Sequence, residues 1–189
     1  MSSNNLFRIG GIAAIASAVL YLVSLGVQFT AIGAPSKLGN ALYIASSLFF
    51  LVVIVVLYMV LRSEAAALAL MALVGLGGIT IWSIFIDPTA AFISPVFGPL
   101  TLAYGIGFII FGWLQYRGSQ YPKGIGILAV ITGVLNVIMA MTLFAGTSMD
   151  IVALLNLILG VPYVIWLIWL GQHWLAGRTT AADDTQEFS

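Results

Sequence analysis

The sequence predicts an all-α fold, a single bundle of six transmembrane helices with both termini on the cytoplasmic side. Three observations predict it: the composition, the spacing of the charged residues and the placement of the basic ones. Of the 189 residues, 62% are hydrophobic and only 6% are charged, and the mean hydropathy is +1.16. Because soluble domains are about 25% charged, water cannot be the main solvent of this chain.

Charged residues divide the chain into long apolar stretches, each reaching the length of about 20 residues that a spanning helix needs. The predicted helices cover residues 9–32, 41–61, 65–86, 96–116, 124–145 and 151–175. Apolar runs such as residues 48–58 (LFFLVVIVVLY) do not alternate with polar residues, so helices are favoured over the strands of a membrane barrel. The first stretch is too long for the apolar core of a signal peptide, and we expect the protein to retain it.

The basic residues indicate the orientation, because loops on the cytoplasmic side of a membrane are enriched in Lys and Arg. An N-terminus on that side places five of the six basic residues there. These five are Arg8, Arg62, Arg117, Lys123 and Arg178, and the one on the outer side is Lys37. Residues 1–8 then form a cytoplasmic tail, and the polar residues 178–189 form a second one that we expect to be disordered.

Several kinds of chemistry need residues that this chain lacks. There are no cysteines, which excludes disulfides, thiolate metal sites and iron–sulfur clusters. The only histidine is His173, so two helical histidines of one chain cannot hold a haem. The net charge is zero, which leaves no basic patch for a nucleic acid. We expect no metal, no cofactor and no nucleic-acid partner.

Acidic and basic side chains are absent from the middle of every predicted span. A charge at the bilayer centre costs about 2.5–3.5 kcal/mol and is retained where protons or ions move, so its absence argues against a pump or an ion-coupled transporter. Asp87 and Asp150 fall outside the membrane while His173 falls inside the cell, so these groups cannot combine as general acid and base. We therefore expect no catalytic residues and no enzymatic activity.

Small and polar residues form stripes along the predicted helices, as they do where helices contact each other in lipid. The stripe of the first helix consists of Gly10, Ala14, Ser17, Tyr21, Ser24 and Gln28. Similar stripes in the fifth and sixth helices predict that Asn136, Asn156 and Tyr163 also point into the bundle. These side chains either hydrogen-bond between helices, at about 0.6–1.7 kcal/mol each, or form the polar lining of a ligand cavity.

The sixth helix carries Trp166, Trp169 and His173 near its cytoplasmic end, at spacings that place them on one face. They are either part of the interfacial aromatic belt, where tryptophan prefers the depth of the headgroups, or a surface for a quinone, pigment or carotenoid. Pro162 removes a backbone hydrogen bond from the same helix and predicts a kink, which in transporters can open a ligand site.

The predicted outer loop, residues 87–99 (DPTAAFISPVFGP), is apolar and contains three prolines that prevent a regular helix. We expect it to lie in the outer interface, with Asp87 either capping a turn or guarding the mouth of a cavity. Residues 11–20 and 126–135 share a pattern of small residues, which leaves open whether the first and fifth helices form a parallel repeat.

Short motifs at the helix ends stand out from the apolar background. They are Arg8-Ile9-x-Gly11, Leu20-Tyr21-Leu22, Tyr58-x-x-Leu61-Arg62 and, joining the fourth and fifth helices, Phe111-Gly112-x-x-x-Tyr116-Arg117-x-Ser119-x-x-Pro122-x-x-x-Gly126. With them the chain resembles a bacterial family of multi-spanning membrane proteins known only as a domain of unknown function, family 4386. The resemblance implies a bacterial inner membrane and a bundle of six or seven spans. It implies no activity, because that family has no agreed catalytic residues.

The sequence thus favours a non-enzymatic multi-pass membrane protein, either a structural or accessory subunit or a binder of a lipid-like molecule. Its expected partners are membrane lipids together with another membrane protein or a second copy of the chain. The alternative is a small carrier for a neutral or hydrophobic solute, which the predicted kink and the buried amides suggest. A membrane enzyme is the third hypothesis and the least favoured.

Overall fold

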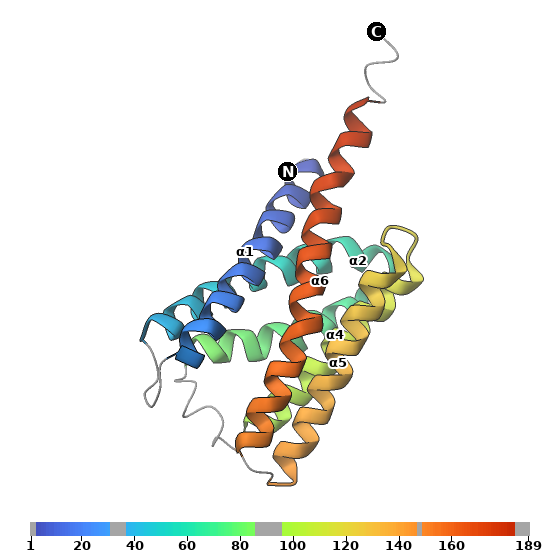
Figure 1. The fold of residues 1–189 in the computed structure, drawn as a ribbon. Coiled ribbons are helices and arrows are strands. Elements are labelled where there is room, and N and C mark those ends of the chain that lie inside the picture. The colour runs from blue at the N-terminus through green and yellow to red at the C-terminus, as the bar shows by residue number, and fades with distance from the viewer. Residues whose placement is uncertain (1–2, 31–36, 86–95, 147–148, 184–189) are drawn as a thin grey trace.

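The computed structural model describes residues 3–30, 37–85, 96–146 and 149–183, and all regular structure within these ranges is helical (Figure 1). The helices are α1 (Ser3–Thr30), α2 (Lys37–Phe85), α4 (Phe97–Arg117), α5 (Lys123–Phe144) and α6 (Met149–Asp183). Each of the five contains a segment long and apolar enough to cross a membrane. The 21 residues of α4, for example, extend about 31 Å at 1.5 Å per residue, which matches a hydrocarbon core about 30 Å thick.

Helix α2 folds back on itself at Ala65, whose backbone angles (φ −157°, ψ 82°) are not helical. A Cβ added at Gly77 would lie 3.8 Å from the Cδ1 atom of Ile54, whereas a straight helix would separate these residues by about 35 Å. The two arms, residues 37–64 and 66–85, therefore lie against each other (Figure 1). The break directly follows Arg62 and Glu64, where the sequence predicts the second helix to end and the third to begin.

Helices that follow each other in the chain also pack against each other. Helix α1 contacts α2, α2 contacts α4, and α4 contacts α5. Helix α6 then packs against both α5 and α1, so the described helices form a closed ring (Figure 1). Fully buried side chains from around the ring fill its centre, among them Leu57, Leu76, Phe108, Ile125 and Leu170.

Glycines bring the backbones of α4 and α5 into direct contact. A Cβ added at Gly112 would lie 2.7 Å from the carbonyl oxygen of Gly126, and one added at Gly133 would lie 2.6 Å from that of Gly105. No real Cβ comes so close, so these positions need glycine for the helices to approach. Such contacts between small residues replace the hydrophobic driving force that is missing between helices in lipid.

The buried and exposed faces of the helices suit a lipid surrounding. Every described side chain of the predicted α1 stripe is buried, including Ser17 and Ser24. Large apolar side chains point outward instead, and Val74, for example, is 65% exposed. An apolar exterior of this kind has a favourable solvent in the hydrocarbon of a bilayer.

The ends of the helices differ from the prediction in three places. Helix α1 begins at Ser3, inside the stretch predicted as a tail, and α6 continues to Asp183, so residues 178–183 are helical rather than disordered. Helix α2 begins at Lys37, four residues before the predicted start at residue 41, whereas α4 agrees with the predicted range 96–116 to within a residue. Residues 87–95 of the predicted outer loop, with Asp87, and the end of the C-terminal tail lie outside the described residues.

Candidate functional site

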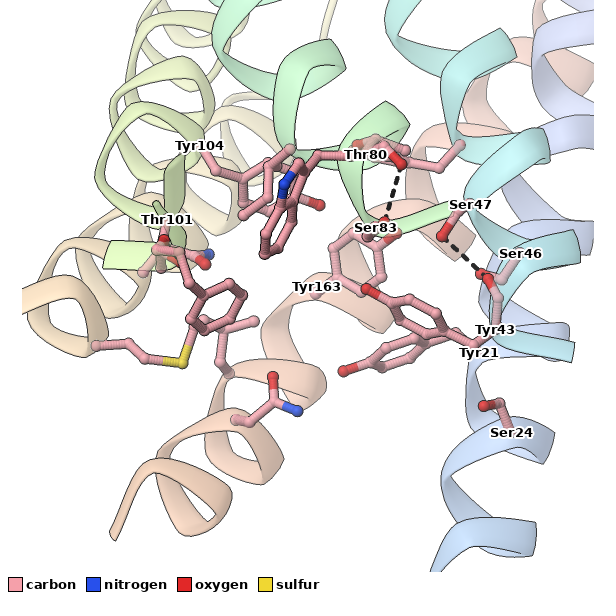
Figure 2. A pocket seen from close by; sticks show the side chains of 18 of the residues that line it. Tyr21, Ser24, Tyr43, Ser46, Ser47, Thr80, Ser83, Thr101, Tyr104 and Tyr163 are labelled. Carbon is pink, nitrogen blue, oxygen red and sulfur yellow. Dashed lines mark hydrogen bonds between the residues drawn. The ribbon is translucent and has the colours of Figure 1, made fainter. Parts of the chain in front are cut away.

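A cavity of about 170 Å³ lies inside the ring of helices. Every helix contributes to its wall: Tyr21, Ser24 and Leu25 from α1; Tyr43, Ser46, Ser47, Phe50, Ile79, Thr80, Trp82 and Ser83 from the two arms of α2; Phe97, Thr101 and Tyr104 from α4; Asn136 and Met139 from α5; and Asn156, Leu159 and Tyr163 from α6. These positions belong to the half of the bundle in which α1 ends and α4 and α6 begin. The side chains converge on this space from all sides (Figure 2).

The wall of the cavity exposes more apolar than polar surface, and its described residues carry no formal charge. Hydroxyl groups of serine, threonine and tyrosine, two asparagine amides and the Trp82 indole supply its hydrogen-bonding atoms. The apolar part consists of aromatic and aliphatic side chains such as Phe50 and Leu159. Within the described lining there is thus no carboxylate, imidazole or amine to act as an acid, a base or an ion ligand.

Most of the serine and threonine hydroxyls in the wall donate their hydrogen to a backbone carbonyl. Thr80 Oγ1 donates to the Leu76 carbonyl at 2.7 Å, and Thr101 Oγ1 donates to the Phe97 carbonyl at 2.8 Å. Ser47 and Ser83 make the same kind of bond within α2, at 3.0 and 2.8 Å. A carbonyl oxygen can only accept, so the direction of these bonds is fixed, and each hydroxyl has no hydrogen left to donate.

Serines also join α1 to the first arm of α2. Ser17 Oγ donates to the Ser46 carbonyl at 3.0 Å, and Ser46 Oγ donates to the Ser17 carbonyl at 2.9 Å. Farther along, Ser24 Oγ donates to the Gly39 carbonyl at 2.8 Å. These buried bonds hold one side of the cavity wall together.

Tyrosines from three helices lie along the remaining walls. Tyr43 lies near Ser47 and Ser83, which belong to the two arms of α2. Tyr104 on α4 and Tyr163 on α6 both pack against the ring of Phe108, at 5.1 and 6.0 Å between centroids. Figure 2 shows Tyr43, Tyr163 and Ser83 close together in the centre of the site.

An aromatic cluster closes the cavity toward the other half of the bundle. The ring of Phe108 lies 6.0 Å from that of Phe50 and 5.2 Å from that of Trp166, between centroids. Tyr163 packs edge-on against Phe50 at 5.5 Å. Phe108 and Trp166 are fully buried, so this cluster forms a floor of interlocking rings below the cavity.

The predicted polar residues are brought together here. Asn136, Asn156 and Tyr163 all line the cavity. Asn136 is buried and donates one N–H to the Thr132 carbonyl at 2.9 Å, while Asn156 is half-buried. The side chain of Gln28 lies outside the part of the chain that the structure describes.

The predicted aromatic face of the last helix is not a single surface. Trp166 is 0% exposed and its indole N–H donates to Gln115 Oε1 at 3.2 Å, whereas Trp169 is 39% exposed and covers Gly124 of α5. His173 Nε2 lies 2.9 Å from the Gln120 carbonyl oxygen. The three side chains separate because the partner for a buried indole N–H lies in the core, while the other two rings pack against α5 and the α4–α5 connection.

The connection between α4 and α5 is packed under the end of α6. Tyr121 is buried there, and its hydroxyl accepts a hydrogen bond of 3.4 Å from the indole N–H of Trp174. Burial raises the pKa of the Tyr121 hydroxyl, and the bond from Trp174 opposes that rise. This end of the molecule thus has a fixed packing and holds no part of the cavity.

Sequence reasoning missed the contribution of α2 to the site, namely Tyr43, Ser46, Ser47, Thr80 and Ser83. A usable signal was present: Ser47 and Ser83 are equidistant in sequence from Ala65. A hairpin with its turn at Ala65 places both at the same height in the bundle, and both line the cavity.

Comparison with family models, with curated proteins and with solved structures finds no match to this chain in any of the three.

Proposed function

We propose that this protein is a non-enzymatic integral membrane protein that binds a small, neutral, lipid-like molecule in the cavity among its helices. The observation that carries the proposal is a mainly apolar cavity whose described lining is uncharged and includes several hydroxyls and two amides. A bundle held together only by apolar contacts would not need so many polar side chains around one space, because burying a polar group has a cost unless it is hydrogen-bonded.

The volume of the cavity sets the size of the ligand. An apolar protein cavity of about 150 Å³ accommodates one benzene molecule, and the space here is about 170 Å³. A single ring, or the ring-shaped end of a longer lipophile, fits this volume. The rings of Phe50 and Tyr163 offer faces and edges against which such a ring packs.

We further propose six membrane crossings with both termini in the cytoplasm. The two arms of α2 each have the length of a span, and Arg62 and Glu64 lie at the turn between them. At the turn between α4 and α5, Arg117 lies 5.3 Å from the ring centroid of Trp113, and Lys123 lies 5.4 Å from that of Tyr116. Cations paired with aromatic rings suit a membrane interface, and their excess at one end favours the cytoplasm.

A bacterial inner membrane is the proposed location, since the helix-end motifs resemble a family found there. Membrane lipids are then the surrounding partners. A structural or accessory role beside another membrane protein is compatible with a ligand-binding bundle and would appear as copurification from native membranes.

Ligand-dependent stabilisation of the purified protein tests the proposal. We expect small neutral aromatic molecules to raise the midpoint of thermal unfolding in detergent, since a ligand at 100 times its Kd adds about 2.7 kcal/mol. In the variant Thr101→Phe the new ring occupies part of the cavity, and the rise should disappear. The matched control is Ser63→Phe, at an exposed site outside the cavity. In this variant the ligand should still raise the midpoint of thermal unfolding. Absence of any rise with ring-sized molecules and with lipid extracts would overturn the proposal.

A carrier for a neutral solute is the second candidate, and Pro162 favours it. This proline lies inside α6 and directly precedes Tyr163, which belongs to both the cavity wall and its aromatic floor. A bend there could move Tyr163 and Trp166 together and open the floor. Solute uptake into vesicles that falls in Asn136→Leu/Asn156→Leu would support transport. Ligand binding without solute uptake would favour the ligand-binding protein over the carrier.

A further inference from the structure

Two cations from neighbouring helices lie together at the end of the bundle opposite the cavity. Arg117 is the last residue of α4, and Lys123 is the first residue of α5. The guanidinium of Arg117 lies 5.3 Å from the ring centroid of Trp113 on its own helix. The ammonium of Lys123 reaches across to α4 and lies 5.4 Å from the ring centroid of Tyr116. Both charges are therefore held beside the aromatic side chains of one helix end.

Both cations are exposed, and neither has an acidic partner in the described part of the chain. The carboxylate of Glu64 comes close to the α4–α5 connection, because a Cβ added at Gly118 would lie 2.6 Å from its Oε1. Even so, neither Arg117 nor Lys123 forms an ion pair with Glu64 or with any other described residue. Two positive charges at this surface therefore have no bound carboxylate.

An exposed apolar face of α5 begins directly at Lys123. It consists of Ile127, Ile131, Val134 and Ile138, which are 44–48% exposed. Spacings of three and four residues place them on one side of the helix. The face extends about 22 Å from Lys123 at 1.5 Å per residue, which is more than half of a hydrocarbon core about 30 Å thick. A lipid at this surface can thus place its headgroup at the cations and an acyl chain along α5.

We propose that Arg117 and Lys123 form a binding site for the phosphate of an anionic phospholipid. A guanidinium can bind two phosphate oxygens through parallel N–H bonds, and an ammonium adds a point charge. Trp113 and Tyr116 are 43% and 44% exposed, and such rings are enriched at the depth of the headgroups. The apolar face of α5 favours a lipid over a soluble phosphate ester.

A lipid with a net negative charge should bind better than a zwitterionic one, because the ammonium group of a zwitterionic lipid offsets its own phosphate. Basic residues near a membrane surface attract anionic lipids in this way. The site lies outside the cavity, so it requires the chain to lie in a membrane but does not depend on the ligand proposed for the cavity.

Phosphatidylglycerol and phosphatidylcholine with identical dioleoyl chains provide the direct test, because only the first has a net charge. Native mass spectrometry of the full chain in a nonionic detergent measures the binding of each lipid. We expect phosphatidylglycerol to bind about tenfold more tightly, which is about 1.4 kcal/mol. Equal binding of the two lipids would overturn the proposal. Displacement of phosphatidylglycerol by an equal concentration of soluble glycerol phosphate would also overturn it, since the site would then not require a lipid.

Matched double substitutions locate the effect. In Arg117→Gln/Lys123→Gln the site loses both charges, so the preference for phosphatidylglycerol should fall to about twofold or less. The control Arg8→Gln/Arg62→Gln removes two exposed charges from the same end of the bundle and should keep the full preference. The exchange Arg117→Lys/Lys123→Arg retains both charges and should keep it too. A preference that survives Arg117→Gln/Lys123→Gln, or an equal loss in the control, would contradict a site at these two residues.

Discussion

Two serines on different helices exchange hydrogen bonds with each other's backbone. Ser17 and Ser46 are both buried, each donates to the other's carbonyl, and their hydroxyl oxygens lie 3.2 Å apart. Helix carbonyls already accept one N–H each, so these hydroxyls use the second lone pair and leave the helices intact. The pair thus joins α1 to α2 through bonds that neither helix could make alone.

A double-mutant cycle measures that junction. Ser17→Ala and Ser46→Ala should show a coupling energy of about 0.6–1.7 kcal/mol in the free energy of unfolding. Ser47→Ala is the control, because Ser47 donates within its own helix to the Tyr43 carbonyl and should not couple to Ser17. The unfolding can be followed by chemical denaturation in mixed micelles. Strict additivity of Ser17→Ala and Ser46→Ala would show that the pair contributes nothing as a pair.

Gln115 is a buried amide, and only one of its two polar atoms forms a hydrogen bond in the described structure. Its Oε1 accepts the Trp166 N–H at 3.2 Å, while its Nε2 has no hydrogen-bond partner among the described residues. The side chain is nevertheless fully buried. We infer that Gln115 stabilises the core mainly as the acceptor for the Trp166 indole N–H, which would otherwise be buried without a hydrogen-bond partner.

Replacement of Gln115 should have a cost that depends on Trp166. Gln115→Leu leaves the indole N–H unpaired and should destabilise the protein by about 1–3 kcal/mol. In a Trp166→Phe background there is no N–H to satisfy, so the same change should cost much less or be neutral. Thermal unfolding of the four proteins of this cycle gives the comparison. An equal cost in both backgrounds would mean that the bond to Trp166 is not what keeps Gln115 in place.

At the scale of helices, α4 and α5 share the most extensive contact in the described part of the chain. Paired glycines set their separation, and one added Cβ at Gly126 would lie 2.6 Å from the Gly112 carbonyl oxygen and from the Tyr116 backbone nitrogen. Backbone atoms cannot move aside as the tip of a side chain can. Even an alanine there must push the two helices apart.

Gly126→Ala should therefore lower the midpoint of thermal unfolding, by an amount typical of core overpacking, about 1–3 kcal/mol. Gly78→Ala is the matched control, because a Cβ at Gly78 would meet nothing within 4 Å. There the gain in helix propensity, up to about 1 kcal/mol, should leave the protein equally or more stable. Similar losses in both variants would contradict a role for the α4–α5 approach.

Most helices could be predicted from the positions of charged residues, because a charge inside the hydrocarbon is costly. That rule placed the break in α2 beside Arg62 and Glu64, and it placed α4 and α5 to within a residue at each end. It failed at the tails, since polar residues such as those of 178–183 form helix readily once they lie outside the hydrocarbon.

The site could be predicted only where polar side chains are rare and large. Asn136, Asn156 and Tyr163 stand out in apolar helices, and they line the cavity. Ser46, Ser47 and Thr80 do not stand out, because such hydroxyls are common in membrane helices and satisfy themselves on their own backbone. Which of them meet depends on the fold of α2 into two arms, a tertiary feature.

At the scale of the whole molecule, the ring of helices places the N-terminus and the end of α6 at the same end of the bundle (Figure 1). The chain contains no cysteine, so single cysteines can be introduced and labelled without a prior removal step. Ser63→Cys and Ser119→Cys mark the turn of α2 and the α4–α5 connection, both in exposed positions. Lys37→Cys marks the opposite end.

Six crossings with cytoplasmic termini predict a clear labelling pattern. In intact cells a membrane-impermeant maleimide should label Lys37→Cys and should leave Ser63→Cys and Ser119→Cys unlabelled. Opened membranes should make all three reactive, which controls for burial. Labelling of Ser63→Cys and Lys37→Cys from the same side would mean that the first arm of α2 does not cross the membrane.

The absence of charged lining residues has an electrical consequence. A membrane voltage does about 2.3 kcal/mol of work per elementary charge for every 100 mV, but it does none on an uncharged molecule entering a wall of hydroxyls, amides and rings. No carboxylate, imidazole or amine lines the cavity among the described residues, so proton concentration has no group there on which to act. Occupancy should therefore stay constant from about pH 5 to 9 for a ligand that does not itself ionise. The occupancy of the cavity would then follow the concentration of the ligand in the bilayer and would not depend on the membrane voltage or the proton gradient.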